Sequence, residues 1–169
     1  MRPVKIVLLE KSHNRKNFNC EEPSLNEYIQ KQAGQDMRKR LATCFVAIDD
    51  NLHVLGFYTL SSESLGREMI PEQYMKQVPR SYNAPVILMG RLARDISAKG
   101  TRLGEFLLMD ALFRSQQLSL KSIGAMAVVV DPINEQAEKF YSKYDFQKLP
   151  DSGKMFLPMR IIDRLFGMI

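Results

Sequence analysis

The hydrophobic run that begins at Val86, and the pattern after it, organise the predicted fold. The run is rich in Val, Ile, Leu and Met and too short to span a membrane, which is typical of a buried strand. A polar loop, 95–100, follows, and from Thr101 apolar residues recur at helical spacing. The recurring residues are Leu103, Phe106, Leu107, Ala111 and Leu112. The segment is predicted to fold as strand, tight loop and helix.

The same analysis predicts alternating strands and helices along the rest of the chain. Further strands are expected at 4–9, 43–48, 53–60, 125–130 and 154–157, with a hairpin turn at 49–51. Helices are expected from a capping box at Ser24 and Glu27 to about Arg38, between Pro71 and Pro79, and after a cap at Asn134. The first helix has an apolar face of Leu25, Tyr28, Ile29, Ala33 and Met37. These elements predict an α/β protein with a mixed sheet, antiparallel early and parallel in the middle.

Composition narrows the class of protein. The 169 residues are 45% hydrophobic and 25% charged, without a linker or repeat, so one domain over 1–169 is expected. With no stretch of about 18 apolar residues, no transmembrane helix is expected, and the cytoplasm is the expected compartment. Cys20 and Cys44 have no metal-binding spacing, and His13 and His53 are isolated, so no metal site is predicted.

The loop after the Val86 strand has the residue types of a phosphate site. A helix that follows a strand through a tight loop presents backbone N–H groups to an anion. Thr101 is the expected N-cap, Gly100 and Gly104 allow close approach to the backbone, and Lys99 and Arg102 add positive charge. The P-loop and dinucleotide-binding motifs are both absent. On residue types alone, an ordinary turn is favoured over a phosphate site.

The net charge of +5 is concentrated in part of the chain. Lys31, Arg38, Lys39 and Arg40 lie close together with only Asp36 among them. Such a balance favours anionic partners, nucleic acid among them, although cations at a solvated helix end have the same pattern.

Two blocks resemble a known superfamily. One is the loop Lys99-Gly100-Thr101-Arg102-Leu103-Gly104, and the other is the strand ending at Val130 with Asn134, Ala137, Phe140 and Tyr141 after it. Their order and residues resemble the GNAT superfamily of N-acetyltransferases, which has Q/R-x-x-G-x-G/A in the loop, and the likeness covers almost the whole chain. It implies the GNAT fold, with a mixed central sheet of about six or seven strands, splayed in the middle, and about four flanking helices.

Within the superfamily, the chain is most similar to the toxin branch of toxin–antitoxin pairs, which acetylates aminoacyl-tRNA. The shared residues are Phe18, Cys20, Leu25, Tyr28, Ile29, Gln32, Ala33, Phe45-Val46, Gly56-Phe57-Tyr58-Thr59-Leu60, Gly90-Arg91-Leu92-Ala93 and Phe140-Tyr141. This likeness implies a small ribbon-helix-helix antitoxin as partner, and homodimers are common in the branch.

The resemblance implies acetyl-CoA as donor and assigns roles to particular residues. Backbone N–H groups from Gly100 to Glu105 are expected to hold the pyrophosphate, and the strand edge at Leu92, Ala93 and Arg94 to pair with the pantetheine arm. The family's second cofactor block corresponds to Asn134, Ala137, Phe140 and Tyr141. Tyr141 is expected to be the general acid for the CoA sulfur, with Tyr144 as the second candidate. No carboxylate identifies itself as a general base.

Two loop residues depart from the family pattern. Lys99 replaces Gln or Arg and keeps a charge but loses a planar fork of donors. Arg102 replaces the middle Gly, which would be strained if that position needs a positive φ. If Arg102 instead lies in the first turn of the helix, it is unstrained and can offer a cation to the phosphates.

The basic balance bears on the acceptor. Aminoglycosides and polyamines are polycations, which an acidic face would attract, whereas a tRNA acceptor stem needs Lys and Arg. The expected RNA-binding residues are Lys31, Arg38, Lys39, Arg40, Lys76 and Arg80. Aminoacyl-tRNA is therefore the favoured acceptor. The alternatives are a protein N-terminus, a small amine, or a non-catalytic module of the same fold that binds CoA or RNA.

Overall fold

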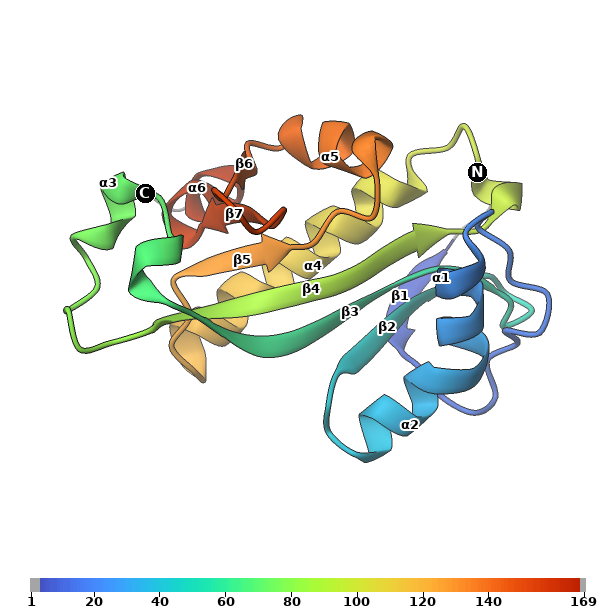
Figure 1. The fold of residues 1–169 in the computed structure, drawn as a ribbon. Coiled ribbons are helices and arrows are strands. Elements are labelled where there is room, and N and C mark those ends of the chain that lie inside the picture. Colours follow the sequence, from blue (N-terminus) through green and yellow to red (C-terminus); the bar gives the residue numbers. More distant parts are fainter. Residues whose placement is uncertain (1–3, 168–169) are drawn as a thin grey trace. The chain divides into compact units, whose positions relative to one another are not determined.

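The computed structural model describes residues 4–167. Its seven strands follow the sheet order β1-β2-β3-β4-β5-β7-β6 (Figure 1). Their bounds are β1 Lys5–Leu8, β2 Thr43–Ile48, β3 Val54–Leu65, β4 Ala84–Arg94, β5 Ala127–Val130, β6 Gln147–Lys148 and β7 Met155–Pro158. The predicted α/β class and mixed sheet are confirmed: β4 and β5 are parallel, whereas β1, β2 and β3 pair antiparallel.

Helices of three kinds connect the strands. The α-helices are α1 Pro23–Glu27, α2 Ala33–Arg38, α3 Glu72–Met75, α4 Leu103–Lys121, α5 Glu135–Ser142 and α6 Met159–Leu165. A π-helical turn, η1 Tyr28–Gln32, joins α1 to α2, and two short 3₁₀ turns are η2 Arg67–Met69 and η3 Ile96–Ala98. None of the helices described for residues 4–167 is both long and apolar enough to cross a bilayer.

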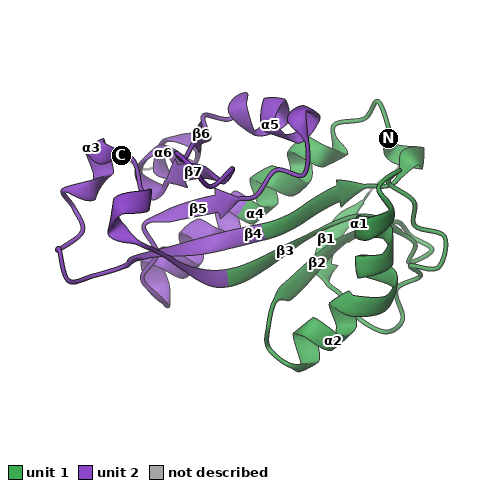
Figure 2. Cartoon of the chain, viewed as in Figure 1, with its two compact units in different colours: residues 1–61, 90–111 green, residues 62–89, 112–169 purple. Residues whose placement is uncertain are grey.

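The chain divides into two compact units (Figure 2). Unit 1 comprises residues 1–61 and 90–111, and unit 2 comprises residues 62–89 and 112–169. The elements β3, β4 and α4 each have one part in unit 1 and another in unit 2. The expectation of one domain over 1–169 stays a prediction.

The core of unit 1 lies between its antiparallel strands and the helical segment α1-η1-α2 (Figure 1). Ile29 and Ala33 are fully buried there, and the ring of Tyr28 stacks on Phe57 with centroids 6.1 Å apart. Leu25 and Met37 pack against the same cluster. The predicted apolar face of the first helix is therefore the face that fills this core.

Gly56 of β3 lies where α4 passes close to the strand. A Cβ at this position would lie 2.7 Å from Cδ1 of Leu107 and 3.1 Å from the carbonyl oxygen of Ala93. The neighbouring Tyr58 donates a 2.6 Å hydrogen bond to Oδ2 of Asp110 on the same helix. Glycine at position 56 thus lets α4 approach β3 closely, and that approach fixes the start of the helix within unit 1.

Unit 2 is built on a mixed set of strands. Residues Ile87–Met89 of β4 pair in parallel with β5, and β5 pairs antiparallel with β7. The segment 66–79 packs on this sheet: Ile70 and Val78 are buried, and the ring centroid of Tyr74 lies 5.7 Å from that of Phe156. The predicted short helix between the two prolines is α3.

The start of the first helix differs from the prediction. The helix begins at Pro23, and Glu22 is its N-cap residue without a side-chain cap. Ser24 lies inside the first turn, where its hydroxyl donates to Oε1 of Glu22 at 3.3 Å. The predicted capping box at Ser24 and Glu27 is wrong. Proline is well suited to the first helical position, because it has no N–H to satisfy and its φ is already helical.

Candidate functional site

The loop between β4 and α4 has the geometry of a backbone anion site. Asp95 shapes its first turn, because Oδ2 accepts hydrogen bonds from the N–H and the hydroxyl of Ser97 at 2.9 and 2.6 Å. Gly100 has a φ of +81°, which favours glycine, and a Cβ there would meet no atom within 4 Å. The backbone at Gly100 is therefore open to a ligand.

Two of the predicted backbone donors are used inside the loop. The N–H of Thr101 donates to the carbonyl of Ala98 at 3.1 Å, and the N–H of Leu103 to the Thr101 hydroxyl at 3.2 Å. Thr101 thus acts on the helix start as a cap does, although α4 begins two residues later, at Leu103. For the N–H groups of Gly100 and Gly104 there is no acceptor within the described chain. These two amides are available as donors in the loop.

The charged loop residues are paired with carboxylates. Arg102 has no positive φ and is unstrained, although it directly precedes α4 and does not lie in its first turn. Its exposed guanidinium donates to both oxygens of Glu105, through Nε at 3.0 Å and Nη2 at 3.2 Å. Lys99 Nζ lies 3.4 Å from Oε1 of Glu21, and both side chains are exposed. An arriving diphosphate would compete with these carboxylates for the two cations.

The predicted pantetheine edge begins where the pairing with β5 stops. The parallel ladder ends at Met89 and Val130, and no ladder to β5 extends to Leu92, Ala93 and Arg94 in the described residues. Ala93 is buried in the core of unit 1, and the N–H of Asp95 donates to the carbonyl of Leu55 at 2.7 Å. Beyond Met89, the β5-facing edge of β4 therefore has main-chain groups that an extended ligand could pair with.

In unit 2, α5 has the predicted cap and holds the predicted general acid. Oδ1 of Asn134 accepts a 2.9 Å hydrogen bond from the N–H of Ala137, as an N-cap does. Tyr141 is only 7% exposed, with the rings of Phe140 and Phe146 each 5.3 Å away. Burial raises the pKa of Tyr141. The phenol therefore stays protonated at neutral pH, as a proton donor must.

The basic residues predicted to bind RNA are all exposed. Lys31, Arg38, Lys39 and Arg40 belong to unit 1, and Lys76 and Arg80 belong to unit 2. Within the described chain, none of the six forms a salt bridge. Among residues 4–167, these six cations are therefore outside any ion pair.

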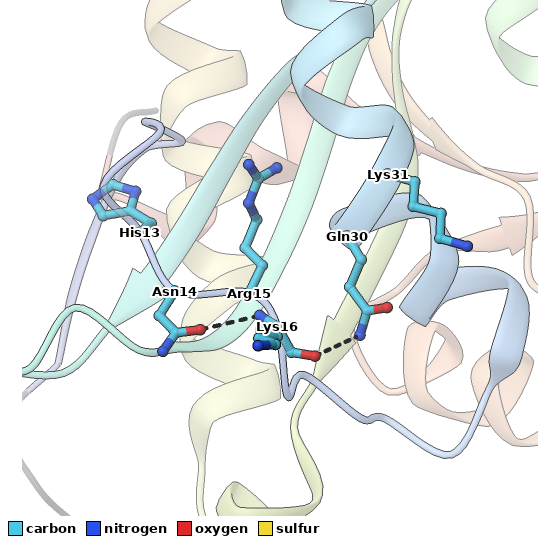
Figure 3. Close-up of a pocket in the computed structure, with 6 residues that line it drawn as sticks. All are labelled: His13, Asn14, Arg15, Lys16, Gln30 and Lys31. Carbon is cyan, nitrogen blue, oxygen red and sulfur yellow. Dashed lines mark hydrogen bonds between the residues drawn. The ribbon is translucent and has the colours of Figure 1, made fainter.

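A basic cavity of 420 Å³ in unit 1 adds residues that the sequence pattern did not reveal (Figure 3). It is lined by His13, Asn14, Arg15, Lys16, Gln30 and Lys31. Arg15 Nη1 donates to the carbonyl of Ile29 at 3.1 Å, and Gln30 Nε2 donates to the carbonyl of Phe18 at 3.0 Å. These bonds fasten loop 14–18 to η1. Only the local density of basic residues at 11–16 signalled this site in the sequence.

The cavity holds positive charge without a matching negative charge. The guanidinium Nη1 atoms of Arg15 and Arg38 lie 3.9 and 3.4 Å from the position a Cβ at Gly34 would occupy. No acidic residue lines the cavity, and Arg15, Lys16 and Lys31 form no salt bridge in the described chain. Like charges gathered in this way favour an anionic ligand.

Solved structures of known function have the same fold. A tyrosine-to-phenylalanine variant of KacT superposes with a TM-score of 0.90 at 28% identity, over 96% of this chain and 99% of that one. AtaT complexed with acetyl-methionyl-tRNAfMet has a TM-score of 0.89 at 26% identity, covering 97% and 99%. AtaTR bound with acetyl-CoA has a TM-score of 0.86 at 26% identity, covering 96% and 98%. The fold defines a protein of the GNAT acetyltransferase class.

Curated relatives identify the family. No protein-family model matches the chain. A tRNA-acetylating toxin of Mycobacterium tuberculosis is 36% identical over 152 residues, covering 89% of each chain. A probable toxin TacT of Sinorhizobium fredii is 29% identical over 164 residues, covering 92% of this chain and 90% of the relative. The chain belongs to the family of tRNA-acetylating toxins.

Proposed function

We propose that this protein transfers the acetyl group of acetyl-CoA to the α-amino group of an aminoacyl-tRNA, as the toxin of a toxin–antitoxin pair. The observation that carries the proposal is 36% identity to a tRNA-acetylating toxin over 89% of both chains. A relative by structure binds acetyl-CoA, and another binds the acetylated aminoacyl-tRNA. The sites below assign residues of this chain to each part of the reaction.

The diphosphate of acetyl-CoA is assigned to the loop before α4. The available amides of Gly100 and Gly104 would donate to its oxygens at the positive end of a long helix. Lys99 and Arg102 would supply charge after leaving Glu21 and Glu105. The remaining predicted contacts, through Thr101, Leu103 and Glu105, shape the loop and hold the start of the helix.

The pantetheine arm is assigned to the edge of β4 at Leu92, Ala93 and Arg94. Its amides would pair with the main chain as an added strand does, because β5 pairs with β4 only as far as Met89. This pairing fixes the thioester in one direction. A fixed thioester and a bound amine supply much of the rate acceleration through positioning alone.

Tyr141 is assigned as the general acid. The neutral amine attacks the thioester carbonyl, the new C–N bond forms, and the C–S bond breaks. The departing thiolate takes the phenolic proton, and the proton of the attacking amine passes to solvent, from which the phenolate is reprotonated. The buried phenol, whose pKa is raised, is the donor form over the whole neutral range. Asn134, Ala137 and Phe140 hold α5 and the ring around it.

The tRNA is assigned to the basic residues. Lys31 and Arg38 lie at or beside the basic cavity of unit 1, with Arg15 and Lys16 as further cations. Lys39, Arg40, Lys76 and Arg80 are exposed and would contact phosphates without reading sequence. The reaction takes place where charged tRNA and acetyl-CoA occur together, and we assign it to the cytoplasm. A ribbon-helix-helix antitoxin is the proposed partner, and a homodimer is the proposed assembly.

One assay tests this function. Purified protein is incubated with radiolabelled acetyl-CoA and a pool of charged tRNA, a matched pool of deacylated tRNA, peptides or polyamines. We expect label on charged tRNA that is released by mild alkali together with the amino acid, and none on deacylated tRNA. Label on peptides or polyamines alone would reject the tRNA assignment. Binding of CoA or RNA without transfer would indicate a non-catalytic module.

A further inference from the structure

Arg91 of β4 lies against the core of unit 1, and among residues 4–167 it has no hydrogen-bond partner. Its guanidinium carbon stands 3.6 Å from the centroid of the Tyr28 ring, so the group stacks on the ring face. In the described chain no acceptor or carboxylate bonds to its N–H groups, although the side chain is half-buried. A half-buried guanidinium normally uses these donors.

The Tyr28 ring beneath Arg91, the aromatic platform, is held in place by a second ring and by hydrogen bonds. Phe57 stacks on the Tyr28 ring with an interplanar angle of 19°. The Tyr28 hydroxyl donates to Oδ2 of Asp36 at 2.8 Å, and Gln32 Nε2 donates to Oδ1 of the same carboxylate at 2.9 Å. Asp36 is thus an anion of this cluster, and each of its two oxygens accepts one hydrogen bond, from Tyr28 and from Gln32.

Stacking on the Tyr28 ring leaves the N–H groups of Arg91 available as donors at the edge of the guanidinium. When a guanidinium lies flat on a ring, its N–H groups point outward in the plane of the group. A pair of such donors matches two oxygens of one phosphate or carboxylate. Lysine could stack on the same ring but would lack this planar fork. The stacked guanidinium of Arg91 is therefore suited to bind an anion from outside the chain, and among the described residues it forms no salt bridge that would stabilise the fold.

The place of Arg91 in β4 indicates which anion it meets. Residues alternate between the faces of a strand, so Arg91 and Ala93 share one face, and Ala93 packs in the core with Tyr28 and Phe57. Arg91 directly precedes Leu92, Ala93 and Arg94, the proposed pantetheine edge. In an aminoacyl-tRNA, the anion nearest to the reacting amine is the phosphodiester of the terminal nucleotide, because the aminoacyl ester itself is uncharged at its carbonyl.

We propose that the Arg91 guanidinium, stacked on Tyr28, binds the 3′-terminal phosphodiester of the aminoacyl-tRNA and so positions the α-amine at the thioester. This inference rests on the proposed function. It gives the site a means of selecting nucleotide-linked amines over amines of similar size without a phosphate. Arg91 is then a substrate-binding residue for the acceptor, and the exposed cations serve the rest of the acceptor stem.

The test is a double-mutant cycle in which one change is a substitution of Arg91 and the other is the removal of a charge from the substrate. The substrates are two aminoacylated minihelices, one natural and one with an uncharged methylphosphonate at the terminal linkage. The proteins are the wild type, Arg91→Gln, Arg91→Lys, and Arg164→Gln as a charge-matched control at an exposed position of α6. For the wild type we expect kcat/KM to fall about tenfold or more on the methylphosphonate. For Arg91→Gln we expect the same low kcat/KM on both substrates. For Arg91→Lys we expect a kcat/KM on the natural substrate between those of the wild type and Arg91→Gln.

The two changes must be non-additive, because each removes the same contact. If the losses simply multiply, or if the wild type is indifferent to the methylphosphonate, Arg91 does not bind that phosphate. An equal loss of acetyl-CoA affinity in Arg91→Gln would identify a structural role and also overturn the proposal. If the wild type acetylates neither minihelix, the proposed function fails, and this result is distinct from the others.

Discussion

The main-chain N–H of Asn19 donates a 2.8 Å hydrogen bond to Oδ1 of Asp95, and so links two positions 76 residues apart. The contact is reciprocal, because the carbonyl of Asn19 accepts from the N–H of Ile96 at 2.8 Å. The segment that leads into α1 is thereby attached to the turn that leads into the proposed diphosphate loop. Within unit 1, the start of the helical layer and the loop share one anchor.

Replacing Asp95 by Ala should loosen this anchor. The variant loses the acceptors for Asn19 N–H, Ser97 N–H and the Ser97 hydroxyl. We expect the free energy of unfolding to fall by about 1 to 2 kcal/mol, the usual cost of removing a capping side chain, and the affinity for CoA to fall with it. Urea denaturation and calorimetry measure the two effects. Asp95→Asn, which keeps one acceptor, should lose less in both, and equal losses would contradict the anchor.

Replacing Tyr141 by Phe should separate binding from transfer. We expect acetyl transfer to fall roughly 100-fold or more, the usual contribution of a general acid, with CoA affinity unchanged. Because burial raises the pKa of Tyr141, its acid form persists above its ordinary pKa. The wild-type rate should therefore show no alkaline decline from this group near that value. Unchanged turnover in the variant would mean that another group is the general acid. Tyr144→Phe, at the second candidate, is the matched comparison for the rate of transfer.

His13 should make the stability of the fold depend on pH. Burial lowers the pKa of His13 from 6.5; the charge of Glu10 opposes this shift, and those of Arg15 and Lys5 add to it. Its Nδ1 accepts a hydrogen bond from Glu10 N–H at 3.0 Å, so the folded state favours the neutral ring. The unfolded chain therefore binds the proton more readily, and stability falls as the pH drops below about 6.5.

The check is denaturation of the wild type and His13→Asn at about pH 7.5 and pH 5.5. Asparagine can still accept from Glu10 N–H but does not titrate in this range. We expect the wild type to lose more stability between the two pH values than the variant loses. A parallel loss in both proteins would assign the dependence to other groups.

Two glycines of unit 1 should differ in their response to alanine. Gly56→Ala places a methyl group 2.7 Å from Leu107 Cδ1 and 3.1 Å from the Ala93 carbonyl, and such overpacking costs about 1 to 3 kcal/mol. Gly100→Ala meets no atom, so its cost is the left-handed backbone alone, about 1 kcal/mol. Gly100→Asn should recover part of that loss, since Asn tolerates a positive φ. Chemical denaturation of the three variants would reveal whether the order holds.

Glu105→Gln should tighten the binding of CoA. The change removes a negative charge beside the proposed diphosphate site and weakens the hold of Glu105 on Arg102. A single charge near a helix N-terminus changes affinity by about two- to fivefold at low salt. Calorimetry at low and high salt measures the gain, which should shrink as salt increases. Glu72→Gln, at an exposed position of α3, is the matched control, and an equal gain there would point to net charge.

Regular patterns in the sequence predicted most of the fold. Strong β-branched runs marked β2 and β5, and the helical spacing after Thr101 marked α4. The cap at Asn134 followed from the ordinary chemistry of an amide before a helix. The ends of helices and strands were harder to predict, because neighbouring residues compete for the terminal positions. The first helix begins at Pro23 and not after a cap at Ser24. The strand β3 extends to Leu65, beyond the predicted end at Leu60, and its residues there alternate between partly buried and exposed up to Ser64.

The site was predictable where a local motif carries it and not where distant segments meet. The loop around Gly100 could be predicted from the local order of strand, loop and helix. The platform of Arg91 on Tyr28 joins residues 63 positions apart in number, and no periodicity marks such a contact. The cavity beside Arg15 likewise depends on how loop 14–18 folds back on η1. Neither the pairing of Arg102 with Glu105 nor the use of the Thr101 amide within the loop can be derived from residue types.

The π-helical turn at Tyr28–Gln32 makes this segment tolerant of one change in length. A π-turn is an α-helical turn that has taken up one extra residue, so deleting one residue there would restore the regular winding and leave α2 in its present orientation. The Tyr28 hydroxyl and Asp36 would then be seven positions apart, a spacing that a regular helix also places on one face. Homologues that keep the aromatic platform are therefore expected to differ in length at this turn by one residue, and by none in the helices on either side.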